Sequence, residues 1–388
     1  MLVPLSYNLR SIFVRRSSTL LTIIGIGATV ATVAGVLALQ NGFATLYSQA
    51  GRSDVGMFLR PGATYEGDSL FSRDRALQLI KGLNEAELDA NNQPLAGMEC
   101  YLAVRRFKVS GGETNVSIRG VQPATIKIRG DEISCSDGRM FEVGNDEVVV
   151  GRKLVNRIRD CGVGDVITLN TTPFRVVGVL ESEGPASSEI WGDLDRILAA
   201  LERSGPNSVI AQIRPDVDFD ALVARLEGDQ QVPAKAIVER EYLTSQTEAL
   251  SAVLVGLSQV LGLIMGIAAV FTATNTMLSA IGARVHEIGI LLSTGFRPSA
   301  IFLSFLFESL LLGLLGGLVG CVMAMPLNGI ETGTTNFQTF TEVAFAFKLT
   351  PQVLVTAVLF SLGLGLVGGL VPAWKAARMT PTEALRRR

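Results

Sequence analysis

The residues with the clearest capacity for a specific interaction lie in one short segment, RVHEIGILLSTGFR, at positions 284–297. Arg284 and Glu287 are three positions apart, so on a helix their side chains are neighbours and can form an ion pair. Four apolar side chains of the segment fall on one helical stripe: Val285, Ile288, Leu291 and Leu292. This pattern is typical of a short amphipathic helix. Its charged face could dock a partner protein, or the helix could be a connector on a membrane surface.

No catalytic signature accompanies this segment. The sequence has no G-x-x-x-x-G-K-[ST] phosphate-binding loop, no G-x-S-x-G, no H-E-x-x-H and no EF-hand pattern. Its single histidine is His286, and its four cysteines have no spacing typical of a metal site or a redox pair. The cysteines are expected to be small buried residues, with at most one disulfide between them. We therefore predict that this chain is not an enzyme and holds no metal and no cofactor.

The 284–297 segment lies between the second and third of four long uncharged stretches, which therefore determine where it is placed. They occupy residues 17–43, 249–283, 309–330 and 349–374. Each has at least about 20 mostly apolar residues, the length that a helix needs to cross the ~30 Å hydrocarbon layer of a bilayer. Charged residues make up only 18% of the chain, below the roughly 25% of soluble domains. The sequence therefore predicts an α-helical membrane protein with four transmembrane helices in a 1+3 arrangement.

The distribution of lysine and arginine predicts the orientation, because short loops rich in these residues stay in the cytoplasm. The N-terminal segment, the 284–297 segment and the tail after residue 374 have an excess of them, whereas the loop at 326–348 has only Lys348. Both termini and the 284–297 segment are thus predicted to be cytoplasmic, and the large domain lies outside. Acidic residues outnumber basic ones in that domain, so nucleic acid is not an expected partner.

Residues 44–245 are predicted to form a large mixed α/β extracytoplasmic domain. Short runs rich in Val and Ile predict strands at 55–60, 101–109, 115–121, 147–150, 166–169, 174–180 and 209–214. Helical patterns lie at 73–83, 152–159, 194–203 and 219–226, the last with Asp218 as its cap. A break rich in Gly, Pro and Ser at 183–188, followed by another at 204–207, leaves open a division into two lobes.

The other segments complete a linear plan. Residues 1–16 form either an amphipathic elbow helix on the inner membrane surface or a disordered tail, and 17–43 form the first span. Residues 246–283 exceed the length of one crossing, so they are predicted to form a stalk and the second span; a tilted helix or a flexible joint is the alternative. Residues 284–297 form the coupling helix, and spans at 298–325 and 349–374 precede a basic tail at 375–388.

Glycines spaced four residues apart predict close helix contacts, because a missing side chain lets two backbones approach in a lipid environment. The pairs are Gly262 with Gly266, Gly313 with Gly317, Gly316 with Gly320, and Gly365 with Gly369. They fit packing within the chain or dimerisation equally well. Glu308 is the lone ionisable residue in the spans; such a residue can be functional, but bonding to the backbone or to Ser309 is the preferred interpretation.

Two motifs resemble the MacB/FtsX-like ABC transporter permeases. The first is R-x-x-E-I-G-I-L-x-x-x-G, and its matching positions are Arg284, Glu287, Ile288, Gly289, Leu291 and Gly295. The second is P-A-x-x-A-A-x-x-x-P-x-E-A-L-R at the C-terminus, which is matched by Pro372, Ala373, Ala376, Ala377, Pro381, Glu383, Ala384, Leu385 and Arg386. The stretches VVVGRKLVNRI, VGDVITL and FRVVGVLE resemble the family's outer domain. His286 and Ser293 depart from the pattern, where Arg and Ala are usual.

The resemblance implies a mechanism and a set of partners. Such permeases pair as dimers and dock a separate or fused ATPase at the coupling helix, and the stalk transmits its movement to the outer domain. For this chain the resemblance implies a cytosolic ABC ATPase in a partner chain, which holds the ATP and Mg. It also implies a second permease copy, a periplasmic adaptor or lipid-bearing partner, surrounding lipids, and the bacterial cytoplasmic membrane as its location.

The predicted function is that of a permease subunit that drives export or extraction of a substrate from the periplasm or outer leaflet. Within the family, an FtsX-like regulator of a cell-wall hydrolase and a lipoprotein-releasing permease are alternatives. A transmembrane receptor is an alternative from a different class. It lacks support because the longest inner loop, of about 14 residues, offers no output domain.

Overall fold

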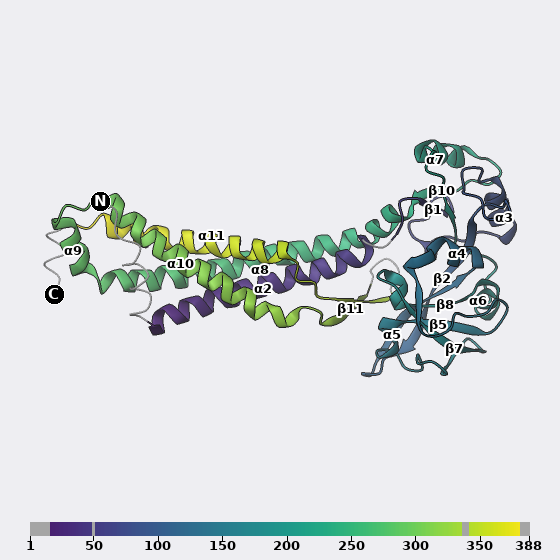
Figure 1. The fold of residues 1–388 in the computed structure, drawn as a ribbon, viewed down its shortest axis with the longest axis horizontal. Helices are drawn as coiled ribbons and strands as arrows, with labels where there is room; N and C mark the ends of the chain where they lie inside the picture. Colours follow the sequence, from purple (N-terminus) through teal and green to yellow (C-terminus); the bar gives the residue numbers. More distant parts are fainter. Residues whose placement is uncertain (1–15, 49–50, 336–340, 381–388) are drawn as a thin grey trace. The chain divides into compact units, whose positions relative to one another are not determined.

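The computed structural model describes residues 16–48, 51–335 and 341–380, and its chain divides into two compact units. One is a helical unit of Met1–Gly42, Ala252–Ile330 and Ala346–Arg388. The other is an α/β domain of Phe43–Ser251 and Glu331–Phe345. Figure 1 shows both with their elements labelled. The predicted elbow helix at 1–16 lies outside the described residues, except for Arg16 at the start of the first described helix.

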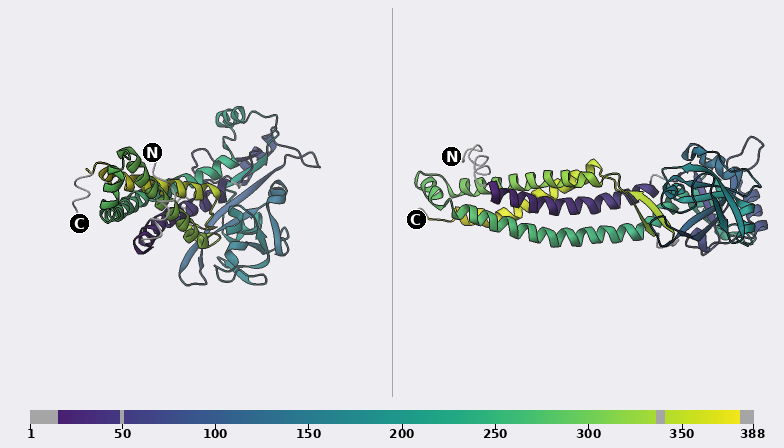
Figure 2. Two further views of the ribbon diagram at one scale, coloured as in Figure 1. Left: turned by 60° about the vertical axis from the view of Figure 1, so that its left-hand side comes forward. Right: turned by 90° about the horizontal axis from the view of Figure 1, so that it is seen from below.

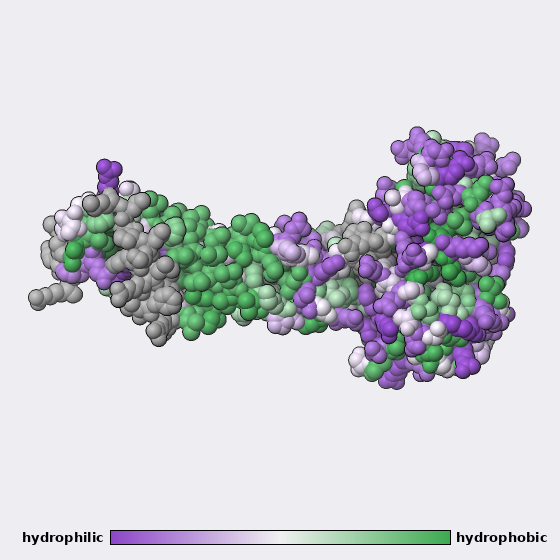
Figure 3. Space-filling view, in the orientation of Figure 1, coloured by the Kyte–Doolittle hydropathy of each residue, from purple (hydrophilic) through white to green (hydrophobic). Residues whose placement is uncertain are grey.

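Four long helices make up the helical unit: α2 (Arg16–Ser48), α8 (Glu239–Gly282), α10 (Pro298–Ala324) and α11 (Pro351–Ala377). Each contains a segment long and apolar enough to cross a membrane, namely Thr19–Thr45, Ser251–Gly282, Pro298–Leu327 and Pro351–Ala377. They run side by side in Figure 2, and apolar residues cover the middle of their length in the view of Figure 3. The predicted four transmembrane helices are confirmed. Pro298 and Pro351 occupy the first helical positions, where a missing N–H costs no hydrogen bond.

The glycines of α10 and α11 let these two helices touch through their backbones. A Cβ on Gly313 would lie 2.7 Å from the carbonyl oxygen of Ser361, and one on Gly365 would lie 2.7 Å from that of Ser309. Gly317 faces the side chain of Ser361, and Gly369 faces that of Ser309. The Ser309 hydroxyl donates a hydrogen bond to the Gly365 carbonyl across this contact. These glycines therefore serve packing within the chain.

The other predicted glycine pairs lie against different helices. A Cβ on Gly316 would lie 2.6 Å from Ile26, and one on Gly320 would lie 2.7 Å from the Gly27 carbonyl oxygen, so both pack against α2. Gly266 faces Leu364 of α11 at 3.3 Å, whereas the nearest atom to Gly262 is on Val33 at an ordinary 3.6 Å. Three of the four pairs thus place both members in tight helix contacts, and the Gly262 pair places one.

A single ten-stranded sheet forms the α/β domain, in the order β10-β1-β9-β2-β3-β8-β5-β7-β4 with β6 beside β7. Its strands are β1 (Val55–Leu59), β2 (Ala96–Phe107), β3 (Glu113–Val121), β4 (Ser134–Gly138), β5 (Glu147–Gly151), β6 (Val166–Leu169), β7 (Thr172–Glu181), β8 (Glu189–Asp193), β9 (Ser208–Gln212) and β10 (Lys235–Val238). All neighbours are antiparallel except β3 with β8 and β5 with β7. Every predicted strand is present, but β4, β8 and β10 had no predicted counterpart.

Short helices cover the sheet: α3 (Arg73–Gly82), α4 (Pro123–Arg129), α5 (Arg152–Val155), α6 (Leu194–Ala200) and α7 (Phe219–Gly228). Asp218 caps α7 as predicted, because its carboxylate accepts from the backbone N–H groups of Asp220 and Ala221. The helix predicted at 152–159 is only one turn long. The residues after it leave the helical path, because the Arg157 carbonyl accepts from the Val109 N–H of the β2–β3 hairpin and the Arg159 N–H donates to the Phe107 carbonyl at the end of β2.

The two largest apolar clusters of the domain lie along the one continuous sheet. The first gathers Phe58, Leu79 and Leu222 around β1, β2, β9 and β10, and the second gathers Ile118, Val148 and Phe174 around β3, β5, β7 and β8. The predicted break at 183–188 is a 3-10 turn, η3 (Pro185–Ser188), that leads into β8 at the middle of the sheet. One sheet therefore runs through both parts of the domain, and the break at 183–188 does not divide it into two separate lobes.

The segment predicted as an outer loop at 326–348 contains a strand pair, β11 (Glu331–Thr335) and β12 (Glu342–Ala346). Glu342 lies 2.5 Å from Nη2 of Arg157 and 2.6 Å from Nζ of Lys108, so the pair is bound to the α/β domain by charge. All four cysteines lie within the described residues and form no disulfide: Cys100, Cys135, Cys161 and Cys321. Burial raises the pKa of the Cys100 and Cys161 thiols to about 12, which makes both unreactive.

Candidate functional site

The predicted coupling segment forms a short helix, α9 (Val285–Ser293), between α8 and α10. Val285, Ile288 and Gly289 are buried, whereas His286 and Glu287 are exposed. The helix ends where Gly295 takes a φ of +94°, a conformation that glycine adopts without strain. The amphipathic pattern predicted for this segment is therefore present, with its charged side turned toward solvent.

Arg284 ties the start of α9 to α10. Its Nε lies 3.2 Å from Oε2 of Glu287, and its Nη1 lies 3.2 Å from Oε2 of Glu308. The side chains of Arg284 and Glu308 are 10% and 9% exposed, whereas that of Glu287 is 56% exposed. The guanidinium also lies over the ring of Phe305, 5.4 Å from its centre. Arg284 thus links an exposed acid to a buried one.

This arrangement corrects the prediction for Glu308. We expected its carboxylate to bond to the backbone or to Ser309; it forms an ion pair with Arg284, which was not predicted, and the Ser309 hydroxyl donates to Gly365 instead. From the sequence, only Glu287 was predicted as a partner of Arg284, because residues three positions apart are neighbours on a helix. The contact with Glu308, 24 residues away, depends on the tertiary fold and leaves no such spacing. A lone acid in an apolar helix could have been matched with the nearest basic residue at the end of the neighbouring helix.

The structure brings the coupling segment and part of the C-terminal motif into one apolar cluster. Ile288 of α9 packs in the same cluster as Ile301 and Phe305 of α10 and Ala373 and Ala376 of α11. Pro372 is buried within α11. Leu291 is half-buried and Gly295 is exposed. The motif residues Pro381, Glu383, Ala384 and Leu385 lie outside the described residues.

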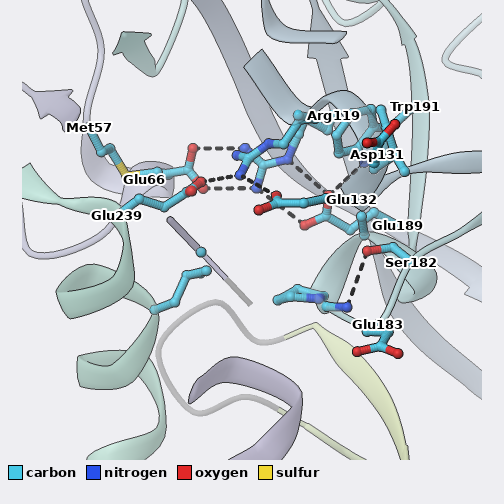
Figure 4. Close-up of a pocket in the computed structure, with 17 residues that line it drawn as sticks. Met57, Glu66, Arg119, Asp131, Glu132, Ser182, Glu183, Glu189, Trp191 and Glu239 are labelled. Atoms are coloured by element: carbon cyan, nitrogen blue, oxygen red, sulfur yellow. Dashed lines mark hydrogen bonds and ion pairs between the residues drawn. The ribbon is translucent and has the colours of Figure 1, made fainter. Parts of the chain in front are cut away.

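A second site, which the sequence did not reveal, is a buried charge network in the α/β domain. Arg119 on β3 makes paired hydrogen bonds to Glu66, both at 2.9 Å, and to Glu189, at 2.9 and 3.2 Å. Its Nη1 also donates to Glu99 at 2.5 Å. Figure 4 shows Glu66 and Glu189 approaching the guanidinium from different sides. Every N–H group of Arg119 therefore has a carboxylate partner.

A second buried arginine extends this network. Arg129, at the end of α4, pairs with Glu239 at the start of α8. The indole N–H of Trp191 donates to Glu189 at 2.7 Å. Burial alone would raise the pKa of Glu189, but Arg119 and these hydrogen bonds hold it below its usual value. Burial raises the pKa of Glu99, in spite of the attraction of Arg119 and Arg129.

A cavity of about 440 Å³ adjoins the network, and its wall includes Arg119, Arg129 and Glu189. Its volume is in the range of small-molecule sites. The members of the network come from separate elements, η1 (Glu66–Asp68), β2, β3, β8 and α8. These residues have no characteristic spacing in the sequence. The network could have been suspected only from glutamates and arginines that occur within strands expected to be buried.

Both the N-terminal and the C-terminal part of the chain match known protein families. Residues 19–229 match the family described as the MacB-like periplasmic core domain, which is more than half of the chain, and residues 260–381 match the FtsX-like permease C-terminal family. A structure of the periplasmic region of MacB from Actinobacillus actinomycetemcomitans covers 51% of this chain and 94% of its own, with 15% identity and a TM-score of 0.36.

Three curated relatives match nearly the whole chain. The macrolide export ATP-binding/permease protein MacB of Agrobacterium fabrum is 29% identical over 97% of this chain, which spans 59% of that protein. The pyoverdine export ATP-binding/permease protein PvdT of Pseudomonas fluorescens is 28% identical over 97% of this chain, which spans 58% of it. The ABC transporter permease YknZ of Bacillus subtilis is 24% identical, and the match covers 97% of both chains. The chain belongs to the MacB/FtsX-like family of ABC transporter permeases.

Proposed function

We propose that this chain is a permease subunit that converts ATP hydrolysis on a separate ATPase chain into movement of its α/β domain, and so drives export or extraction of a substrate. The observation that carries the proposal is the attachment of α9. Arg284 bonds to Glu308 of α10, and Ile288 lies in one buried apolar cluster with Ala373 of α11. A force on α9 would therefore act on two membrane helices together.

The proposal also gives α8 a role as the connection to the α/β domain. This helix runs unbroken from Glu239 to Gly282 and ends two residues before α9 begins. The relatives named for macrolide and pyoverdine export support export over regulation of a cell-wall hydrolase. Neighbouring genes for an ATPase and a periplasmic adaptor would add support for export, and the two permease copies of the working complex are proposed to be identical.

The orientation in the proposal puts α9 and both termini in the cytoplasm and the α/β domain outside. It rests on the excess of lysine and arginine in the segments that carry α9 and the termini. Reporter fusions after Gly295 and Arg388 should report an inside location, and fusions after Gly112 and Gly333 should report outside. An inside signal at Gly112 would overturn the orientation.

Cross-linking tests the docking of an ATPase on α9 directly. His286→Cys places an exposed thiol on the charged side of α9. When the chain is produced with a candidate ABC ATPase chain that co-purifies with it, a short bifunctional reagent should join this thiol to the ATPase. Gly112→Cys, at an exposed turn of the α/β domain, is the matched control and should give no such product. Equal cross-linking from both positions, or from neither while the complex co-purifies, would contradict docking at α9.

A further inference from the structure

We propose that the α/β domain binds a small organic cation, an amine or guanidinium group carried on an apolar body, in the cavity beside Arg119. The site is separate from α9 and its proposed ATPase contact. The proposal does not depend on the proposed function, because it concerns the charge and shape of the α/β domain alone.

The first argument is an imbalance of buried charge. Four glutamates of the network are almost completely buried, at 3%, 0%, 5% and 1% exposure: Glu66, Glu99, Glu189 and Glu239. Among the described residues, two arginines form ion pairs with them, Arg119 and Arg129. Unpaired negative charge in a protein interior is costly unless a proton or another cation neutralises it. The network therefore favours a cation in the space next to it.

The remaining charged residues of the cavity wall add to this imbalance. Asp131, Glu132 and Glu183 also line the cavity, and all three are exposed. Burial raises the pKa of Glu132, although Arg129 opposes the shift. Of the described residues that line the cavity, the basic ones are Arg119 and Arg129, whose charges already face carboxylates of the network. An anion would thus meet a wall with an excess of carboxylates, whereas a cation would be attracted.

The second, independent argument is a buried amide without a partner. Gln246 of α8 is 6% exposed, and neither its Oε1 nor its Nε2 has a hydrogen-bond partner among the described residues. It lines a small chamber of about 40 Å³. An unpaired buried amide costs about 1–3 kcal/mol, so such a group is expected to meet a ligand or a water.

The small chamber and the cavity share one wall. Glu66, Arg119 and Glu189 line both. A ligand in the cavity therefore lies against carboxylates that also form part of the wall around Gln246. A cationic group that reaches the chamber could donate to the Gln246 carbonyl oxygen while a carboxylate balances its charge.

The chemistry of the walls favours an organic cation over a metal ion. No three His, Cys, Asp or Glu side chains within the described ranges are placed to hold a metal. Apolar side chains make up much of the lining: Met57, Ile133, Pro185, Ala186, Trp191 and Leu243. Pockets of this size, with apolar walls and a few polar groups, are typical of small organic ligands. The same chemistry could come from a free amine or from a lysine or arginine side chain of a protein.

Trp191 provides a direct readout, because it lines the cavity and donates its indole N–H to Glu189. The full chain has one other tryptophan, so a Trp374→Phe background isolates the Trp191 fluorescence. In lipid nanodiscs, phenethylamine should change this fluorescence saturably. The neutral 2-phenylethanol and the anionic 3-phenylpropionate, which have nearly the same body, should bind at least about tenfold more weakly. A second arm with a short acetylated peptide containing one arginine separates a free amine from a protein side chain.

Three variants assign the binding to this cavity. Glu183→Gln and Asp131→Asn each remove one negative charge from the wall, and each should weaken phenethylamine binding about threefold to tenfold. Glu227→Gln removes an exposed charge on α7, outside the cavity, and should leave the affinity unchanged. Gln246→Leu should weaken binding about tenfold while raising the Tm of the ligand-free chain, because it removes an unpaired amide.

The binding measurements distinguish a specific cation site from non-specific partitioning. Selective binding of the amine or of the arginine peptide, weakened at Glu183 and Gln246 but not at Glu227, supports the site. Equal responses to the amine and the alcohol would show partitioning into the lipid rather than a site, and would overturn the proposal. Binding that Glu183→Gln and Gln246→Leu leave unchanged would overturn it as well. ATPase cross-linking at His286 could succeed or fail without affecting either result.

Discussion

The Nη1 atom of Arg284 lies 3.2 Å from Oε2 of Glu308, although the two residues are 24 positions apart and belong to different helical segments. Both side chains are about nine-tenths buried. Breaking a buried ion pair by removing one charge is costly, because the remaining charge stays desolvated without its counter-charge. The pair therefore fixes where α9 joins α10.

The first prediction concerns this pair. Glu308→Met removes the buried acid of this pair, and Arg284→Met removes its buried cation. Each single variant should lose about 3–5 kcal/mol of stability, the usual cost of breaking a buried pair. The double variant has no buried charge and should be more stable than either single variant. Thermal unfolding of the purified chain in detergent measures this order, and a double variant that is the least stable of the three would contradict the pairing.

The second prediction concerns Glu287, whose side chain is 56% exposed beside Arg284. Glu287→Lys reverses the charge on the surface that we propose for ATPase docking, so it should reduce co-purification with the ATPase and the ATPase activity that the permease stimulates. Arg284 keeps Glu308 as a partner, so the chain should still insert and fold. Glu331→Lys makes the same reversal at an exposed site on β11 and should have no effect. Unchanged ATPase pull-down and activity with Glu287→Lys would exclude α9 as the coupling site.

The third prediction uses the glycine contacts. A methyl group on Gly320 would lie 2.7 Å from the Gly27 carbonyl oxygen, so Gly320→Ala must push α2 and α10 apart and should cost about 1–3 kcal/mol. Gly363 has no atom within 4 Å of the equivalent position, so Gly363→Ala is a matched control that should be neutral or slightly stabilising. Gly262→Ala should behave like the control, because its nearest neighbour is 3.6 Å away. Equal Tm losses from Gly320→Ala and Gly363→Ala would contradict these contacts.

The sequence predicted those parts of the fold whose signal is local. The four apolar helices, the amphipathic segment at α9 and most strands follow from composition and periodicity within a few turns of chain. Strand β8 did not, because EIWGD carries two acids and every one of its residues is buried. Its burial depends on Arg119, which lies 70 residues away in the sequence and forms an ion pair with Glu189.

The same limit applied to the candidate sites. Arg284 and Glu287 were predicted as a pair from their spacing, but the partnership of Arg284 with Glu308 needed the geometry of α10. The glycine pairs marked close contacts correctly on α10 and α11, whereas the spacing at Gly262 gave no indication that its neighbour Val33 lies at an ordinary distance. Tertiary charge pairs have no sequence period, so a pattern-based reading does not reveal them.

The last prediction separates two glutamates that bind the same arginine. Glu189 makes two hydrogen bonds to Arg119 and one from Trp191, and its pKa is held below 4.5. Glu99 makes one hydrogen bond to Arg119, its Oε1 has no partner among the described residues, and its pKa is raised above 4.5. Glu189→Gln should therefore cost about 3–5 kcal/mol at neutral pH. Glu99→Gln keeps a carbonyl oxygen for Arg119 and removes excess negative charge, so it should cost little or be stabilising.

The pH dependence should have opposite signs for the two residues. A lowered pKa means that the Glu189 carboxylate stabilises the fold above pH 4.5 and that this contribution is lost as the pH falls through the lowered value. A raised pKa means that ionised Glu99 destabilises the fold, increasingly as the pH rises above 4.5. The Tm of Glu99→Gln relative to the unmodified chain should thus increase as the pH rises above 4.5, whereas the deficit of Glu189→Gln should shrink as the pH falls below 4.5. Parallel pH profiles for the two variants would show that the network does not distinguish its glutamates, and that its excess charge does not reside on Glu99.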